Sequence, residues 1–233
     1  MTAGTPITTT TTIPPMAEAA LLRLLAWLSP AFPTGGFAWS QAVEWAVEAG
    51  DISDEASLRC WLEDVLRYGA GRADAILLRH AHGAQGDAAA LLDIAELACA
   101  VQPARERLAE TVGQGNAFVL AASPWGADVI AGLGDLPYPV AVGALAGRHG
   151  IDADAACAGF LQASSANMIS AAVRIVPLGQ SAGLRVLAAL EPVFLTVAAQ
   201  TRNATLDDLG GACFRAGLAA MRHETQYTRL FRS

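Results

Sequence analysis

The chain has 233 residues, of which 53% are hydrophobic and only 16% are charged, and its net charge is −7. This acidic balance argues against nucleic acid as the main partner, because the phosphate backbone attracts basic surfaces. All 15 basic residues are arginine, so the chain has neither a P-loop lysine nor a Schiff-base lysine. The high apolar content indicates a large core or a surface that a partner covers.

Residues 1–16 form a threonine-rich segment without the basic and apolar regions of a secretory signal. We expect this segment to be a disordered tail. Alanine, the strongest helix former, is abundant in residues 17–233, whereas valine and isoleucine rarely cluster. We therefore predict that residues 17–233 form one all-α domain, a single helical bundle of about ten helices.

In the first half of the chain, apolar periodicity and capping residues predict a succession of helices. The first helix leads into a loop that contains two prolines and two adjacent glycines, Gly35 and Gly36. Six helices are expected in this half. In chain order they are residues 17–28, Ser40 to Gly50, a helix that starts at Ser53 or Asp54, a short helix that ends near His82, a helix that starts at Asp87, and Pro103 to Ala122.

In the second half, residues 123–138 are rich in glycine and proline, and we expect them to be loop-rich. The stretch from Ala155 to Val173 carries no formal charge but is too polar for a membrane span. Its small residues recur about one helical turn apart, which suits close helix packing; they are Gly159, Ala163, Ala166 and Ser170. The expected helices are Pro139 to Gly150, Asp152 to Val176, residues 180–201 with a break at Pro192, and a last helix after a capping box at Thr205 and Asp208.

The cysteines and histidines do not have the spacing of metal ligands, so no metal site is predicted. The cysteines are scattered without a C-x-x-C motif, which favours buried free thiols in a reducing compartment and hence a cytoplasmic protein. His80 and His82 are two residues apart, so on a helix they would point to different sides. The complete set is Cys60, Cys99, Cys157, Cys213, His80, His82, His149 and His223.

One short motif raises the alternative of a serine hydrolase. Residues 179–183 read G-x-S-x-G, the nucleophile elbow of α/β-hydrolases, with Ser181 as the nucleophile. Asp207 or Asp208 and then His223 follow in the order of that family's triad, and Gly35-Gly36 would be the oxyanion loop. However, an elbow requires a preceding strand and a parallel sheet, whereas this motif follows a predicted long helix that Pro177 ends. We therefore favour a helix–loop–helix corner.

Two further segments have unusual composition. Residues 221–233 carry a net charge of +2, against −9 for the rest of the chain, and are rich in arginine and aromatic residues, which anchor protein interfaces. This segment is either a partner-binding tail or a last helix that packs Leu230 and Phe231 onto its own domain. Residues 29–40 form a rigid apolar loop, whose Phe32, Phe37 and Trp39 we expect to plug the core.

Three segments together resemble the UreF family of urease accessory proteins. They are LSPAFPTGGFAWSQAVEWAVEAG (Leu28–Gly50), AAVRIVPLGQSAG (Ala171–Gly183) and MRHETQYTRLFRS (Met221–Ser233). The resemblance covers the chain after about residue 17, and three motifs in the right order are more specific than any one of them. It implies a non-catalytic, all-α protein that dimerises and joins UreD (also called UreH) and the GTPase UreG on apo-urease during nickel insertion. UreG would carry the nickel and the GTP, so no cofactor is expected on this chain.

The resemblance also implies site residues. Those for UreD contact lie in the tail: Arg222, His223, Glu224, Gln226, Tyr227, Arg229, Leu230, Phe231 and Arg232. Those for the dimer and the UreG-facing surface are Arg174, Pro177, Gly179 and Gln180, with Gly35, Gly36, Ser40, Gln41 and Glu44 as weaker candidates. We hypothesise that the tail is disordered or loosely packed when free and becomes ordered on UreD. A helical adaptor of an unrelated pathway is the remaining alternative.

Overall fold

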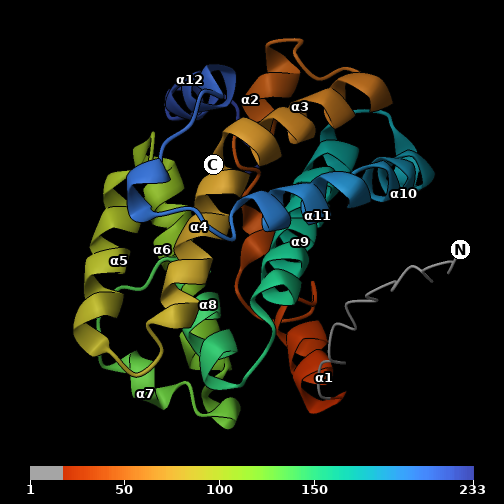
Figure 1. Ribbon diagram of the computed structural model, residues 1–233. Helices are drawn as coiled ribbons and strands as arrows, with labels where there is room; N and C mark the ends of the chain where they lie inside the picture. The colour runs from red at the N-terminus through yellow and green to blue at the C-terminus, as the bar shows by residue number, and fades with distance from the viewer. Residues whose placement is uncertain (1–17) are drawn as a thin grey trace, which may run out of the picture.

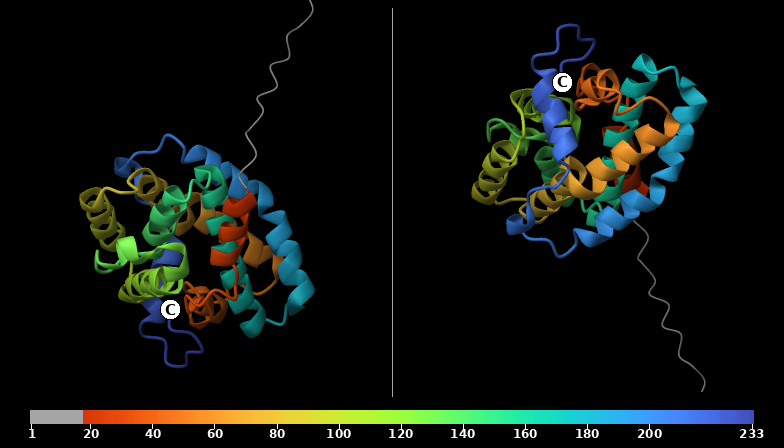
Figure 2. Two further views of the ribbon diagram at one scale, coloured as in Figure 1. Left: turned by 90° about the horizontal axis from the view of Figure 1, so that it is seen from below. Right: turned by 90° about the horizontal axis from the view of Figure 1, so that it is seen from above.

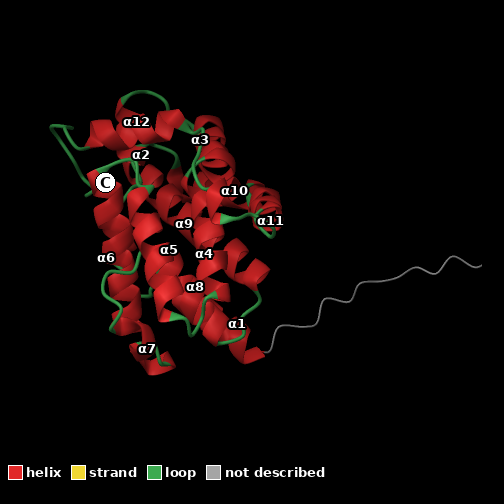
Figure 3. Cartoon of the chain, turned by 60° about the vertical axis from the view of Figure 1, so that its left-hand side comes forward, coloured by secondary structure: helices red, strands yellow, loops and turns green. Residues whose placement is uncertain are grey.

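The computed structural model describes residues 18–233, so the tail predicted for residues 1–16 lies outside the described part (Figure 1). Residues 18–233 contain twelve α-helices and three short 3-10 helices, and no strand is found among them (Figure 3). Ten of these α-helices have ten residues or more, which confirms the predicted all-α fold.

The helices are α1 (Glu18–Trp27), η1 (Gly36–Ala38), α2 (Val43–Glu48), α3 (Glu55–Tyr68), α4 (Ala70–Gly83), α5 (Ala88–Ala100), α6 (Arg105–Ala121), η2 (Ser123–Trp125), α7 (Asp128–Ala131), α8 (Tyr138–Arg148), α9 (Ala153–Ile175), α10 (Gly179–Ala189), α11 (Glu191–Gln200), η3 (Leu206–Asp208) and α12 (Phe214–His223). The long helix α9 runs through the middle of the bundle and packs against α2, α4, α8, α10 and α11 (Figure 1).

Local capping explains why most boundaries agree with the predictions. The side chains of Asp54, Asp87 and Asp152 accept hydrogen bonds of 2.8, 3.0 and 2.9 Å from the backbone N–H three residues further on. Each bond satisfies one of the N–H groups that the first turn of a helix leaves free. Pro192 lies in the first turn of α11 and separates this helix from α10, as predicted.

Three predictions about individual segments are wrong. The capping box at Thr205 and Asp208 forms but closes only η3, because glycines at 210 and 211 follow and the last helix starts at Phe214. Pro103 precedes the N-cap Ala104 of α6 and is not inside its first turn. The N-cap of α2 is Ala42 and not Ser40. Residues 123–138, by contrast, are loop-rich as predicted, with the short helices η2 and α7 among the loops.

Helices α4 and α8 approach each other closely in the core. Gly143 and Gly147 of α8 lie one helical turn apart on the face toward α4. A Cβ atom at either position would be 2.2 Å from a carbonyl oxygen of α4, that of Leu78 or His82. Glycine is therefore required at both places for the two helices to pack at this distance.

One helical stretch of the described chain, Gly179–Gln200, is long and apolar enough to cross a membrane by length and composition alone. Core helices of soluble proteins pass the same test, so a single stretch is weak evidence. Here the stretch is two helices, α10 and α11, which both pack against α3 and α9. The stretch 155–173, considered above, belongs to α9, whose Gly159 packs against Leu28 and Leu24.

The four cysteines are free thiols, in agreement with the prediction, but only Cys157 is buried. Cys60 is exposed, and Cys99 and Cys213 are half-buried. His80 and His82 point to different sides of α4, as expected, because their Nε2 atoms meet the carbonyl oxygens of Ala204 and Ile151.

Candidate partner-binding site

The C-terminal tail, residues 224–233, leaves α12 as a projecting loop and returns to the bundle between α2 and α6 (Figure 2). Its end forms backbone hydrogen bonds at and just after the end of η1: Arg232 N–H donates to the Ala38 carbonyl at 2.9 Å, and Ser40 N–H donates to the Ser233 carbonyl at 3.0 Å. The Phe231 side chain is buried and the Leu230 side chain is exposed. The structure thus corrects the hypothesis of a loosely packed tail, and of the pair expected to pack onto the domain only Phe231 does so.

The carboxylate of Glu44, on α2, holds the returning segment of the tail. It accepts hydrogen bonds from the backbone N–H groups of Leu230 at 2.6 Å and of Phe231 at 3.0 Å. It also lies 3.1 Å from His223 Nε2. The N–H groups of Leu230 and Phe231 have no helical carbonyl to bond. The Glu44 carboxylate supplies the acceptor that such groups need when they are shielded from water.

His223, the last residue of α12, is completely buried. Its Nδ1 lies 2.6 Å from one carboxylate oxygen of Glu106, and the other oxygen of Glu106 accepts a 2.6 Å bond from Arg229. Both ring nitrogens therefore have carboxylate partners, one on α2 and one on α6. Glu106 was not identified from the sequence, where it is one of many glutamates in helical segments.

Three more glutamates complete the attachment. Glu110 of α6 accepts a 2.7 Å hydrogen bond from the Ser233 hydroxyl, and Glu48 of α2 accepts one from the Gln226 amide. Glu224 acts in the opposite direction, because its carboxylate accepts the Arg105 N–H at 2.7 Å and caps the start of α6. We call Glu44, Glu48, Glu106 and Glu110 the glutamate cradle.

The predicted tail residues thus divide into two groups. His223, Gln226 and Phe231 are buried against the bundle, and Glu224 is half-buried. The exposed residues are Arg222, Tyr227, Arg229, Leu230 and Arg232. Tyr227 is fully exposed and Leu230 is 67% exposed, on a loop whose two ends are fixed by the cradle.

Arg174, near the end of α9, connects the tail to the loop before α2. Its guanidinium lies 3.9 Å from the ring centre of Phe37 and 4.3 Å from that of Phe231. It also donates a 3.1 Å hydrogen bond to the Phe37 carbonyl. Gly35 adopts a φ of 75°, which suits glycine, at the turn that presents Phe37. Phe37 is 71% exposed and does not plug the core, whereas Phe32 packs on Phe118 and Trp39 is buried.

The structure separates the residues predicted for the dimer and UreG surface. Ser40 and Glu44 are buried and hold the tail, so they cannot face a partner directly. Gln41 bonds Ser164 of α9 at 3.1 Å, and Gly36 lies against Asn167 of the same helix. Pro177, Gly179 and Gln180 are exposed where α10 begins, and Leu184 is exposed one turn further along that helix.

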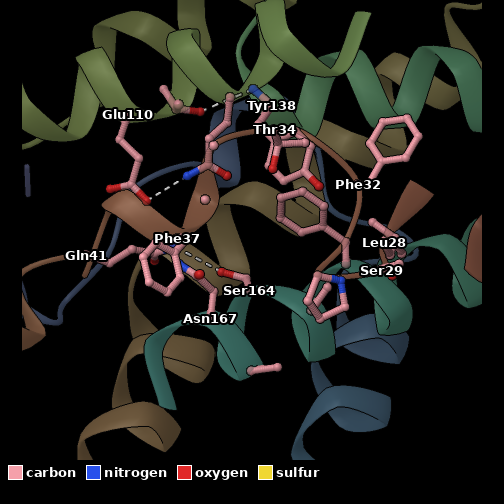
Figure 4. A pocket seen from close by; sticks show the side chains of 18 of the residues that line it. Leu28, Ser29, Phe32, Thr34, Phe37, Gln41, Glu110, Tyr138, Ser164 and Asn167 are labelled. Carbon is pink, nitrogen blue, oxygen red and sulfur yellow. Dashed lines mark hydrogen bonds between the residues drawn. The ribbon is translucent and has the colours of Figure 1, made fainter. Parts of the chain in front are cut away.

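A cavity of about 390 Å³ lies between the loop 28–37, α6 and α9 (Figure 4). Its wall is apolar at Leu28, Phe32 and Tyr138 and polar at Gln41, Glu110, Ser164 and Asn167. A second cavity of about 430 Å³ lies beside α12 and includes Phe214, Leu218 and Met221 in its wall. Both cavities are lined by Gln41, Asp74 and Arg107.

Asp74 of α4 is the most perturbed acid in this region. Burial raises the pKa of its carboxyl from 3.8 to about 7, Arg107 opposes the shift and Glu110 adds to it. Arg107 itself forms an ion pair with Glu110. Asp74 was not identified from the sequence, since nothing in the helix 70–83 distinguishes it from a solvated residue.

Ser181 does not have the surroundings of a hydrolase nucleophile. It lies exposed in the first turn of α10, after the end of α9, and not on a strand-to-helix turn. Both nitrogens of His223 already face Glu106 and Glu44, so this ring is not available as a base for Ser181. The G-x-S-x-G segment is a helix–helix corner, in which Gly183 packs against Ile169.

No cluster of three or more histidine, cysteine, aspartate or glutamate residues within 18–233 is arranged to hold a metal ion. The expectation that nickel and GTP are carried by a partner stays a prediction.

The fold and the site define an all-helical protein that holds its residues 224–233 in a glutamate cradle and exposes aromatic and aliphatic side chains beside it. Residues 52–191 match the UreF family model. The chain is 51% identical over 229 residues to the urease accessory protein UreF of Rhodopseudomonas palustris (strain TIE-1), covering 95% of each chain. It is 52% identical over 221 residues to the protein of that name from Bradyrhizobium sp. (strain BTAi1 / ATCC BAA-1182), covering 92% of each. The chain therefore belongs to the UreF family of urease accessory proteins.

Proposed function

We propose that the chain is a cytoplasmic, non-catalytic urease maturation factor that joins UreD (UreH) and the GTPase UreG on apo-urease. In this role it supports GTP-dependent insertion of nickel into urease, with the nickel and the nucleotide carried by UreG. Family membership supports the proposal, because the relatives are named urease accessory proteins. The sequence resemblance supports the choice of partners.

The observation that carries the proposal is the exposed tip of the tail. Tyr227 and Leu230 project from a loop that is fixed at His223 and Gln226 on one side and at Phe231 on the other. A tyrosine and a leucine held in a fixed loop lose little conformational entropy on binding, which favours them as interface anchors. We assign this tip, with the exposed Arg222 and Arg232, to contact with UreD.

We assign the exposed face of α10 to the homodimer. Gln180 and Leu184 lie four residues apart and therefore on one face of this helix, and Leu184 is 67% exposed. The exposed ring of Phe37, stacked on Arg174, is assigned to UreG contact. Arg174 contacts both Phe37 and Phe231 of the tail, so this one side chain supports the proposed UreG surface and the proposed UreD surface.

A co-expression pull-down of the tagged chain with UreD and UreG tests the proposal. We expect a complex that contains both partners, and we expect the double variant Tyr227→Ala/Leu230→Ala to lose UreD while keeping its helix content. Leu120→Ala is the matched control, because Leu120 is 79% exposed near the end of α6. A well-folded chain that associates with neither partner would favour the adaptor of another pathway.

A deletion of residues 221–233 would be a less decisive test than these point variants. That deletion removes His223, Phe231 and Ser233, and it leaves the buried Glu44 and Glu110 without their tail partners. Loss of binding after the deletion would therefore mix lost contacts with lost stability.

A further inference from the structure

Each ring nitrogen of His223 faces the side chain of a glutamate. Nδ1 lies 2.6 Å from Glu106 and Nε2 lies 3.1 Å from Glu44, and both partners are carboxylate oxygens. A neutral imidazole carries one N–H and one lone pair, so one of the two contacts would place a lone pair against a carboxylate oxygen. The imidazolium donates to both sides and satisfies both contacts.

The charges around the ring balance only in that form. Glu44 on α2, Glu106 on α6 and Arg229 in the tail are the charged partners of the group. With an imidazolium the four side chains sum to zero, and with a neutral ring they sum to −1. The other charged residues of the tail and of the helices packed around it are Glu48 on α2, Arg105, Arg107 and Glu110 on α6, Arg215 and Arg222 on α12, and Glu224 and Arg232 in the tail. Of these, Arg107 is already paired with Glu110.

The same two carboxylates that hold the ring also hold the tail. Glu44 accepts the N–H groups of Leu230 and Phe231, and Glu106 accepts Arg229. A change of charge at His223 therefore acts directly on the groups that attach residues 229–231.

The attached tail also contains a buried amide oxygen, that of Gln226, without a hydrogen-bond partner in the described structure. An unsatisfied buried acceptor opposes docking, so the docked state depends on its charged contacts.

We propose that His223 is a proton-operated latch for the tail. As imidazolium it bridges Glu44 and Glu106 and holds residues 224–233 between α2 and α6. When the ring loses a proton, one contact becomes repulsive, the buried group gains a net negative charge, and the tail is released. The consequence for a partner rests on the proposed function: Tyr227 and Leu230 are presented in one fixed geometry only while the latch is closed.

Hydrogen–deuterium exchange of the full chain, read on peptides that cover residues 224–233, tests the latch. The pH is raised from about 6 to about 9, the range in which protein histidines titrate, and the rates are corrected for intrinsic exchange. We expect protection of the tail to fall by up to about tenfold per pH unit, the slope of linkage to one proton. Equal protection at both ends of the range overturns the proposal.

Variants separate His223 from other titrating groups. His223→Gln is expected to leave the tail unprotected at every pH. His80→Gln, which alters a half-buried ring bonded to the Ala204 carbonyl, is expected to keep the wild-type profile. A pH-dependent tail in His223→Gln would assign the switch to another group and refute the latch.

A measurement on the unmodified chain does not depend on how the variants fold. In ¹⁵N-histidine-labelled protein, both nitrogens of His223 are expected to be protonated while the tail is docked. A docked tail with a singly protonated ring would contradict the latch. UreD affinity measured over the same pH range distinguishes the two proposals: pH-dependent protection with pH-independent UreD binding supports the latch and refutes the tail as the UreD site.

Discussion

The carboxylate of Glu44 accepts the backbone N–H of Phe231, a residue 187 positions further along the chain. This single contact joins the second α-helix to the last residues of the protein. Because the carboxylate is buried and serves Leu230 and His223 as well, it stabilises the whole tail.

Replacing Glu44 with alanine is expected to lower the free energy of unfolding by about 2–4 kcal/mol, because it leaves a buried histidine and two backbone N–H groups without their acceptor. Urea denaturation followed by circular dichroism measures the change. Glu63→Ala is the control, since Glu63 is a partly exposed partner of Arg67 one turn away on α3, and its unfolding midpoint should match the wild type. Equal effects of the two variants would show that Glu44 does not hold the tail.

Phe231→Ala and Tyr227→Ala should separate the stability of the tail from its contacts. Phe231 is buried against Arg174, and its loss is expected to destabilise the chain by about 3–5 kcal/mol. Tyr227 is fully exposed, so its replacement should leave the unfolding midpoint unchanged. Thermal unfolding and UreD binding by calorimetry measure both effects. A Tyr227 variant that binds UreD normally would remove this residue from the proposed interface.

Gly143→Ala is expected to lower stability by about 1–3 kcal/mol, because the new Cβ would lie 2.2 Å from the Leu78 carbonyl oxygen and push α8 away from α4. The control is Gly113→Ala in the interior of α6, where an added Cβ meets nothing within 4 Å. That change should stabilise the chain by about 0.5–1 kcal/mol, since alanine is the better helix former. The shift of the denaturation midpoint from the wild type is measured for both variants. Shifts in opposite directions would support the close packing of α4 and α8.

Asp74→Asn should change the pH dependence of stability. Burial raises the pKa of Asp74 from 3.8 to about 7, so the folded chain holds a proton that the unfolded chain has released between these values. Stability is therefore lost as the pH rises from about 4 to about 7. Asparagine cannot ionise, and the variant is expected to be more stable than the wild type at pH 8 by on the order of 2 kcal/mol.

The measurement for Asp74 is urea denaturation at several pH values. Asp154→Asn is a useful opposite case, because Arg202 and Arg79 hold the pKa of Asp154 below its usual value. That variant should lose stability at neutral pH, and the difference from the wild type should disappear as acid protonates Asp154. Identical slopes in Asp74→Asn and the wild type would show that Asp74 is solvated in the folded chain.

The sequence was sufficient for those parts of the fold that depend on neighbouring residues. Asp54, Asp87 and Asp152 cap helices that begin at the next residue, and Pro192 divides α10 from α11, because capping and proline geometry act within one turn. The capping box at Thr205 shows the limit of such signals. It forms, yet the helix does not continue through Gly210, which has a φ of 120°.

The glutamate cradle could not be predicted, because its members look like solvated residues in the sequence. Glu106 and Glu110 face the tail because α6 packs against α12, the helix from which the tail leaves. The resemblance identified the tail and Arg174 as important, but it could not show that Ser40 and Glu44 point inward. Burial of a charged side chain depends on contacts between distant segments, and periodicity carries no information about them.

Arg174 lies between Phe37 and Phe231, so the three segments that identify the family meet at one side chain. These segments are therefore not interchangeable modules. In a chimaera that takes only residues 221–233 from a relative, the residues around Phe231 would change while Arg174 and the loop that carries Phe37 would stay the same. Exchanging loop, arginine and tail together should preserve the stack, so compatible sets of these residues are expected to be inherited as a unit.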